Sequence, residues 1–302
     1  MENFKIVIAI PTFRRILLLK KLLISLFSEL NPRDIFIVVG DNDCGNEVPA
    51  LISTLIDMFP SVMCIPVDAR GISQVRNALV EFVSGNFYNW QYLIMLDDDG
   101  YVMPGWFESL QNTFNEFPAE VYGGPVLGDI PDRSNFLARN SLYATRASRY
   151  LGYVDSLSGA QNIVIAKSTL NYIDYPLFDP AYGLSGGEDY AFFRRLKAKG
   201  ARFVWAADAC VTEPTPIERL HPKRVLSRYY TTGKYMATID LNYDGLYPTL
   251  YNAIKGLIGS LAKFLKNALF VNVNGLAASM LLLAHFLGRL MGLAGSRSSR
   301  YL

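Results

Sequence analysis

Four short apolar runs alternate with three amphipathic segments in the first 96 residues, and this alternation restricts the fold more than any other feature. The runs are rich in Ile and Val and have the length of strands buried on both faces; they lie at 4–10, 34–40, 62–67 and 90–96. The intervening segments carry apolar residues at helical spacing and lie at 16–27, 47–59 and 72–83. This order predicts an α/β fold, an open and mostly parallel Rossmann-like sheet flanked by helices, with Pro11 ending the first strand.

Polar side chains follow three of these strands at the point where each is expected to end. They are Thr12 and Arg14 after the first strand, Asp41 and Asn42 after the second, and Asp97–Asp99 after the fourth. Parallel sheets bind ligands at the carboxyl ends of their strands, so these residues are expected to gather at one edge. Three consecutive aspartates repel one another, so a positive partner is expected there, and carboxylates of this kind suit a divalent cation.

The chain between residues 160 and 211 continues the pattern with a strand at 163–166, a helix at 188–200 and a strand at 201–211. The helix has acids in its first turn, bases in its last turn and Gly200 as its C-terminal stop. Two nucleotide-binding motifs, GxGxxG and GxxxxGK[ST], are absent from the sequence, which excludes a dinucleotide fingerprint and a P-loop.

The last third of the chain differs in charge and hydropathy. Residues 1–218 hold 18 Lys/Arg and 25 Asp/Glu, a net charge of −7, whereas residues 219–302 hold 11 and 2, a net charge of +9. We therefore expect one domain at 1–220. Residues 221–302 would form a basic, apolar helical region.

Two helices are expected in this C-terminal region, from about residue 250. The first has an apolar face formed by Ile254, Leu257, Ile258, Leu261, Leu265 and Ala268, and the second, at 276–295, is interrupted by His285 and Arg289. No clean run of 18 apolar residues is present, so these helices are expected to lie on an anionic membrane surface rather than to span it. Packing on the body of the protein, or self-association into a homo-oligomer, is the alternative.

The three cysteines, Cys44, Cys64 and Cys210, are scattered and form no CxxC motif. They are interpreted as reduced thiols of a cytosolic compartment. The N-terminal residues "MENFKIVIAIPTF" enter the first strand directly, with no pattern typical of a signal peptide. Together with the basic C-terminal region, this predicts a peripheral protein at the cytoplasmic face of the cell membrane, and nothing indicates a nucleic-acid partner.

Five motifs occur in one order: "IPTFRR", "VVGDND", "RGISQVRN", "LDDDG" and "GGEDYAFFRRL". Their combination over roughly residues 4–235 resembles the family 2 glycosyltransferases of the GT-A fold, and within them the bacterial enzymes of exopolysaccharide and surface-glycan synthesis. The resemblance implies an inverting, metal-dependent enzyme. Its catalytic domain would span 1–220, with a nucleotide-sugar half at about 1–100 and an acceptor half at about 101–220. It would move a sugar from a nucleotide diphosphate donor, UDP-sugar being the first choice, to a polyprenyl-diphosphate-linked or growing oligosaccharide acceptor.

The resemblance also assigns roles to single residues. Donor nucleotide binding falls to Pro11, Thr12, Arg14, Asp41, Arg76, Asn77, Asp97 and Asp98. Asp97 and Asp99 match the outer positions of the DXD motif, and Asp99 is expected to bind Mn²⁺ or Mg²⁺. Many relatives have a histidine as a further ligand after the last strand, where this chain has Glu213; Glu213 is the first candidate for that ligand and His221 the second.

The segments "GAQN" and "GGED" match the acceptor side of the family's site, so Asn162 and Gly187 are expected to contact the acceptor. Asp189 matches the catalytic base and Glu188 its companion. A carboxylate at this position can take the proton of the attacking hydroxyl group, and direct attack from one face inverts the anomeric carbon. Without the other motifs, "GGED" would equally fit an ordinary helix start.

Two other functions share part of this pattern. A sugar-nucleotide nucleotidyltransferase also has a nucleotide-binding α/β sheet and acidic metal ligands, but it usually has a glycine-rich loop after the first strand, and "IPTFRR" contains no glycine. A non-catalytic nucleotide-sugar-binding subunit would not need the complete set of aspartates and "GGED". Pyrophosphate release from a nucleoside triphosphate and a sugar phosphate would indicate the first alternative. Asp189→Asn should abolish transfer and leave donor binding near normal, and unchanged turnover in that variant would remove the base assignment.

Overall fold

A computed structural model describes residues 4–144 and 149–295, which form two compact units. Within the described part, the first unit contains residues 4–126, 149–184 and 191–213. The second contains residues 127–144, 185–190 and 214–295. The sequence suggested a boundary near residue 220; contacts place it at 213, and the helical unit also takes two segments from the preceding part of the chain.

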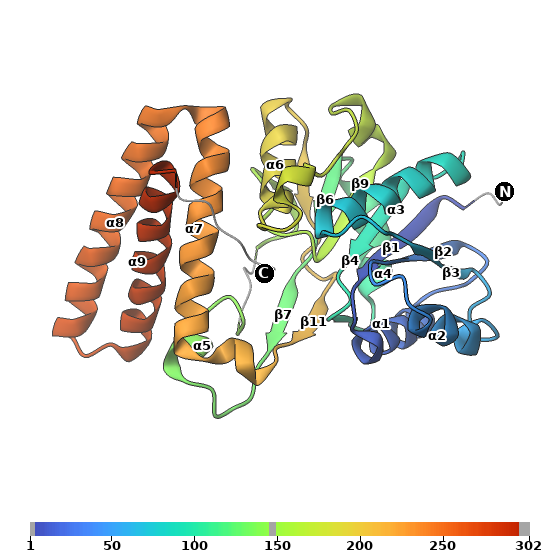
Figure 1. Cartoon of the computed structure of the whole chain (residues 1–302), viewed down its shortest axis with the longest axis horizontal. Helices are drawn as coiled ribbons and strands as arrows, with labels where there is room; N and C mark the ends of the chain where they lie inside the picture. The colour runs from blue at the N-terminus through green and yellow to red at the C-terminus, as the bar shows by residue number, and fades with distance from the viewer. Residues whose placement is uncertain (1–3, 145–148, 296–302) are drawn as a thin grey trace. The chain divides into compact units, whose positions relative to one another are not determined.

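An eight-stranded sheet organises the first unit, with strand order β3-β2-β1-β4-β9-β6-β10-β8. Figure 1 labels β1, β2, β3, β4, β6 and β9 of this sheet. Its strands are β1 (Ile6–Thr12), β2 (Ile35–Asp41), β3 (Val62–Pro66), β4 (Tyr92–Leu96), β6 (Val121–Gly123), β8 (Gly152–Val154), β9 (Asn162–Ala166) and β10 (Phe203–Trp205). The first four strands are parallel, in the order 3-2-1-4, whereas β9 runs antiparallel to both β4 and β6. The predicted mostly parallel α/β sheet is confirmed, and the carboxyl ends of β1, β2 and β4 share one edge.

Helices cover both faces of this sheet, because alternate strand residues point to opposite sides. One core contains Ile8 and Ile10 of β1 with α1 (Ile16–Glu29), α2 (Glu47–Leu55) and α4 (Trp106–Glu116). The other contains Val7 and Ala9 with α3 (Ile72–Asn86) and the Ala191–Ala198 part of α6 (Glu188–Ala198). A strand buried on both faces needs the unbroken apolar run that the sequence has there.

Two predicted strand boundaries were wrong. Pro11 does not end the first strand: β1 continues to Thr12, and Pro11 is paired with Gly40 of β2. The pairing of β1 with β4 stops at Ala9, so the missing N–H of Pro11 costs no bond on that side.

The single strand predicted at 201–211 is two strands in different sheets. β10 pairs with β6 and β8, and after a turn β11 (Val211–Pro214) pairs antiparallel with β5 (Tyr101–Val102). The smaller sheet has the order β5-β11-β7, where β7 is Val126–Asp129. Apolar content alone could not reveal this change of partner, because both strands are short and the turn residues between them are mostly alanines.

Three long helices make up most of the second unit: α7 (Pro222–Asp244), α8 (Leu246–Leu269) and α9 (Val273–Leu293), with the short α5 (Phe136–Arg139) (Figure 1). Helix α9 packs against both α7 and α8. Glycines allow the close approach: a Cβ atom on Gly233 of α7 would lie 2.0 Å from the His285 carbonyl oxygen, and one on Gly288 of α9 would lie 2.0 Å from the Tyr230 carbonyl oxygen. The predicted C-terminal helical extension is therefore present.

Among the described helices, α9 alone is long and apolar enough to cross a membrane by length and composition. Its mean hydropathy is 1.6, and 33% of the apolar window is buried inside the chain. The core helix of a bundle passes the same test, and α9 packs on two neighbouring helices.

A buried polar cluster crosses the helical unit. The Arg289 guanidinium of α9 donates to Asp240 Oδ2 of α7 at 2.6 Å, and the Tyr190 hydroxyl donates to Asp240 Oδ1 at 2.6 Å. The side chains of Arg289 and Asp240 are 8% and 7% exposed. One turn before Arg289 on the same helix, burial and the neighbouring Arg289 charge lower the pKa of His285 to about 4.

His285 therefore makes stability depend on pH. Because its pKa is depressed in the folded state, the unfolded chain binds more protons between about pH 6.5 and 4, and stability falls as pH falls through that window. We expect a loss of about 2 kcal/mol between pH 7 and 5 from this group. Urea unfolding followed by circular dichroism at the two pH values measures it, and His285→Gln should remove that part of the loss. An identical pH dependence in wild type and variant would contradict the expectation.

Candidate active site

The three aspartates after β4 are compensated by arginines of the same unit. Arg15, the residue before α1, donates through Nη1 to Asp98 Oδ1 at 2.9 Å and to Asp99 Oδ2 at 3.0 Å. Arg76, in the first turns of α3, donates through Nη2 to Asp97 Oδ1 at 2.8 Å. The local charge of −3 thus meets two guanidinium groups before any ligand binds.

Asp98 is the most enclosed of the three. Its side chain is 5% exposed, and the Thr12 hydroxyl at the end of β1 donates to Asp98 Oδ2 at 2.7 Å. Burial raises the pKa of Asp98 to about 6, although the charge of Arg15 and the Thr12 hydrogen bond favour the ionised form. Asp98 and Thr12 therefore join the ends of β4 and β1, while Asp97 and Asp99, at 27% and 13% side-chain exposure, are more accessible.

Arg76 and Asn77 are both buried, at 3% and 6% exposure. The Arg76 guanidinium carbon lies 5.5 Å from the centroid of the Phe178 ring. Asn77 Nδ2 donates to the Phe178 carbonyl at 2.6 Å, and Asn77 Oδ1 accepts from the Phe178 N–H at 2.9 Å. The pair predicted to bind nucleotide thus holds Asp97 on one side and the chain around Phe178 on the other.

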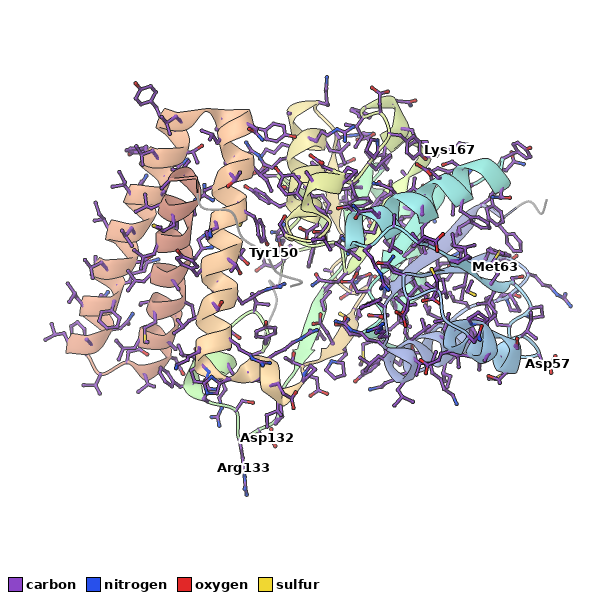
Figure 2. All side chains as sticks on the ribbon, viewed as in Figure 1. Asp57, Met63, Asp132, Arg133, Tyr150 and Lys167 are labelled. Atoms are coloured by element: carbon purple, nitrogen blue, oxygen red, sulfur yellow. The ribbon has the colours of Figure 1, made fainter. Side chains whose placement is uncertain are left out.

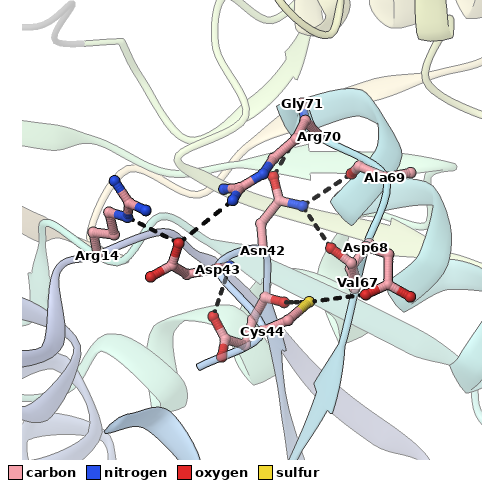
Figure 3. A network of polar contacts seen from close by, with 10 residues as sticks. Arg14, Asn42, Asp43, Cys44, Val67, Asp68, Ala69, Arg70 and Gly71 are labelled. Atoms are coloured by element: carbon pink, nitrogen blue, oxygen red, sulfur yellow. Dashed lines mark hydrogen bonds and ion pairs between the residues drawn. The ribbon is translucent and has the colours of Figure 1, made fainter. Parts of the chain in front are cut away.

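The end of β2 organises the loop before α3 (Figure 3). Asn42 Nδ2 donates to the carbonyls of Val67 at 2.7 Å and Ala69 at 2.9 Å, and Asn42 Oδ1 accepts from the Gly71 N–H at 3.2 Å. Asp41, predicted to bind the nucleotide base, is 3% exposed and accepts the N–H of Asp43 at 3.0 Å. These hydrogen bonds hold the residues after β2 and the loop before α3 in place.

A second, exposed cluster flanks this loop, where Arg14 Nε donates to Asp43 Oδ1 at 2.8 Å and Arg70 Nη2 lies 3.5 Å from the same oxygen (Figure 3). Both guanidinium carbons lie over the Phe13 ring, at 5.1 Å for Arg14 and 4.7 Å for Arg70. The side chains of Arg14 and Arg70 are 67% and 51% exposed. This surface offers two positive groups and an aromatic ring to an anionic, planar ligand.

Sequence reasoning missed Arg15. The motif "FRR" contains two arginines, and only Arg14 was selected; the structure places Arg14 at Asp43 and Arg15 at the aspartates after β4. Arg14 has a positive φ of 55°, which turns the chain between the two side chains. The three like charges after β4 were a signal that a base must lie near, but they did not indicate which one.

A divalent cation at these carboxylates stays a prediction. Within residues 4–144 and 149–295, no three His, Cys, Asp or Glu side chains are grouped so as to hold a metal ion by themselves. Mg²⁺ usually takes one or two carboxylates and completes its shell with water and substrate phosphates, and Asp97 and Asp99 suit that donor set.

The two candidates for a further metal ligand lie in different units. Glu213 is buried at 5% exposure, in the first unit. The antiparallel register pairs Thr212 with Tyr101, so one further step brings Glu213 beside Gly100, next to Asp99. His221 is exposed and lies at the start of α7, in the second unit.

Asn162, predicted to contact the acceptor, is 3% exposed at the start of β9. Its Nδ2 donates to the carbonyls of Pro125 and Ala209 at 3.2 and 2.8 Å, and its Oδ1 accepts from Trp106 Nε1 at 3.2 Å. These bonds tie β9 to its surroundings and give Asn162 a structural role. A contact with an acceptor stays a prediction.

The "GGED" segment lies in the second unit against α7. Gly186 and Gly187 have φ of 79° and 99°, and a Cβ atom on Gly187 would lie 2.6 Å from Tyr235 Cδ2, so only glycine fits there. Burial raises the pKa of Tyr235, and the charges of Asp189 and Glu188 add to the effect, so this hydroxyl stays protonated at neutral pH.

The two acids of this segment differ in access. Glu188 is 7% exposed, whereas Asp189 is half-buried, and Asp189 Oδ1 accepts the N–H of Tyr190 at 2.7 Å. Tyr190 is in turn held by Asp240 of α7. The accessible carboxylate of the pair is thus on a segment fixed by its neighbours, as a catalytic base requires.

This chain is similar to several known proteins. Among curated proteins, the succinoglycan biosynthesis protein ExoM of Rhizobium meliloti (strain 1021) is 25% identical over 200 residues, which are 66% of this chain and 62% of that protein. The chain therefore matches about three fifths of the length of this relative.

Solved structures with a similar fold include S. aureus TarS 1-349 in complex with UDP-GlcNAc, with a TM-score of 0.57 and 13% identity over 97% of this chain and 93% of that chain. The complex of the same protein with UDP gives a TM-score of 0.55 at 12% identity, over 97% and 92% of the two chains. At this identity the likeness concerns the fold, which is that of the GT-A glycosyltransferases.

The family model described as "Glycosyl transferase family 2" matches residues 7–173, more than half of the chain. This region contains the strand ends of β1, β2 and β4 together with Arg15, Arg76 and the three aspartates. The chain belongs to glycosyl transferase family 2.

Proposed function

We propose that this protein is an inverting, metal-dependent glycosyltransferase of bacterial surface-polysaccharide biosynthesis. It moves a sugar from a nucleotide diphosphate donor to a lipid-linked or growing glycan acceptor. The observation that carries the proposal is the set of carboxylates after β4, held by Arg15 and Arg76, in a chain of this family. The relative named for succinoglycan biosynthesis supports the polysaccharide assignment.

The donor is proposed to bind at the ends of β1, β2 and β4. Arg14 and Arg70 offer exposed positive charge beside the Phe13 ring, and Asp41 lies at the neighbouring strand end. A nucleotide has a planar base and an anionic diphosphate, which match these groups. The TarS structures contain UDP-GlcNAc or UDP, which favours a UDP-sugar for this chain.

Asp99 is proposed to bind Mn²⁺ or Mg²⁺, with Asp97 and Glu213 close to it in the chain's first unit. When bound, such a cation neutralises the charge that develops on the departing diphosphate. Arg15 forms ion pairs with Asp98 and Asp99, and so offsets the repulsion between these two carboxylates when the cation is absent. Among the described residues no group of side chains encloses a metal ion by itself. This agrees with a cation that takes a few hard oxygen ligands from the protein and completes its coordination shell with phosphate.

Asp189 is proposed to take the proton of the acceptor hydroxyl as its oxygen attacks the anomeric carbon. The bond from that carbon to the nucleotide diphosphate breaks, and the nucleotide leaves with the bonding electrons. One base and one displacement invert the configuration. Glu188 is buried beside it, and Tyr190 and Gly187 hold the segment in place.

Calorimetric titration of UDP, GDP and dTDP with and without Mn²⁺ tests the donor site and its metal. We expect one nucleotide to bind only with Mn²⁺, and Asp99→Asn to weaken it at least about tenfold, because a metal-mediated diphosphate contact is lost. Asp57→Asn is the matched control, since Asp57 is an exposed aspartate at the end of the α2 region. Binding that is indifferent both to Mn²⁺ and to Asp99 would remove the proposed metal site.

A further inference from the structure

Helix α8 has a continuous row of exposed apolar side chains. The row contains Tyr247, Tyr251, Ile254, Ile258, Leu261, Leu265 and Leu269, with exposures between 43% for Ile254 and 84% for Tyr247. Their spacing of four and three residues places them on one side of the helix. The opposite side, with Thr249, Ala253 and Ser260, is the buried one. Side chains project along the whole outer side of α8 in Figure 2.

The turn between α8 and α9 extends this surface. Leu269, Phe270, Val271 and Val273 are 78%, 70%, 78% and 54% exposed, and we call residues 269–273 the hairpin tip. Loop tips in soluble proteins are usually polar, and a contiguous exposed apolar surface marks a site of interaction. The apolar row and the hairpin tip together form one such surface.

Positive charge accompanies the row. Lys255, Lys263 and Lys266 are exposed on α8, and the sequence contains no Asp or Glu from residue 245 to its end. Lys255 lies with its Nζ 5.7 Å from the Tyr251 ring centroid. Apolar side chains bordered by lysines and tyrosines, with no acidic residue, match the chemistry of an anionic lipid surface.

We propose that the apolar row and the hairpin tip are a membrane-docking surface, and that its partner is a bilayer containing anionic phospholipids. Helix α8 lies along the headgroup region with the apolar row toward the acyl chains, and the lysines contact lipid phosphates. Helix α9 contributes only Val273 to this surface, because more of α9 than of α8 is buried against the neighbouring helices. The inference does not depend on sugar transfer.

A second copy of this chain is the other occupant of comparable chemistry. The four-and-three spacing of the row also fits a helix–helix seam. A symmetric pair through this face would place lysines of one copy near lysines of the other, with no acid on α8 to offset them. Charge therefore favours the lipid surface over self-association.

Vesicle sedimentation with the full chain tests the proposal. The protein should bind vesicles of phosphatidylcholine with phosphatidylglycerol and bind much less to phosphatidylcholine alone. Ile258→Glu or Leu265→Glu should each weaken binding about tenfold, because a charge replaces an inserted apolar side chain. Lys255→Gln and Lys266→Gln should each weaken it about fivefold, with less dependence on salt.

Met58→Glu is the matched control, since Met58 is 60% exposed in the first unit and should leave vesicle binding unchanged. Circular dichroism should give wild-type melting temperatures for these variants, because the replaced side chains are exposed. Vesicle binding unaffected by Ile258→Glu and Leu265→Glu would overturn the proposal. A wild-type protein that ignores anionic vesicles, but forms a dimer that Leu265→Glu disrupts, would overturn it in favour of self-association.

Discussion

Replacing Asp189 with Asn is expected to lower kcat about 10³-fold while nucleotide binding stays within a factor of two or so of wild type. The amide keeps the size and the hydrogen bond from Tyr190 N–H but cannot take the acceptor proton. Steady-state assays with donor and acceptor, combined with calorimetry of the nucleotide, separate the two effects. A loss in kcat with unchanged donor affinity is what a base produces.

Glu188→Gln provides the comparison for this variant. Glu188 is 7% exposed, so its replacement should change turnover through the position of the segment and by a smaller factor. Asp57→Asn is the surface control and should behave as wild type. Unchanged turnover in Asp189→Asn would remove the base assignment, whereas a wild-type chain that binds the nucleotide but transfers no sugar would favour a non-catalytic nucleotide-sugar-binding subunit.

Replacing Arg289 with Met is expected to destabilise the protein by about 3–5 kcal/mol. Met keeps much of the volume but removes the guanidinium group that donates to the Asp240 carboxylate, which is 7% exposed. The free energy of unfolding from urea titration measures the effect. Asp240→Asn combined with Arg289→Met should cost less than the sum of the two single changes, because the double variant has no unpaired buried charge.

Arg224→Met is the matched control, since Arg224 is an exposed arginine at the start of α7 and its loss should change stability by less than about 0.5 kcal/mol. Because Tyr190 donates to Asp240, Arg289→Met should also lower turnover through the adjacent Asp189 without changing nucleotide affinity. A cost below about 1 kcal/mol would show that the Arg289–Asp240 pair is not needed for the stability of the helical unit.

The residues at the strand ends show how much of the candidate site could be predicted from the sequence. Strands buried on both faces need unbroken apolar runs, so β1, β2, β3 and β4 could be located from local composition within one or two residues. Their parallel order then fixed which polar residues share an edge. Predicting Thr12, Asp41 and Asp97–Asp99 together required no knowledge of side-chain packing.

Which arginine meets which aspartate depended on the tertiary structure. Arg14 and Arg15 are adjacent and chemically identical, and the backbone turn at Arg14 sends one to Asp43 and the other to Asp98 and Asp99. The sequence analysis expected the Asn162 side chain to contact the acceptor, but in the structure this side chain makes three hydrogen bonds within the protein. Pairing between distant residues cannot be read from local pattern, because it depends on backbone direction over many residues.

For the C-terminal region, too, some properties follow from the sequence and others only from the tertiary structure. Sequence determined that it is helical, basic and apolar, because periodicity and charge are local properties, and it also determined the α/β class and the likeness to glycosyl transferase family 2. Only the tertiary structure decided that α9 packs on both neighbouring helices while the apolar row of α8 stays exposed. Both helices have enough apolar residues to be buried. Glycines let α7 and α9 approach closely, so α9 is the helix that becomes buried.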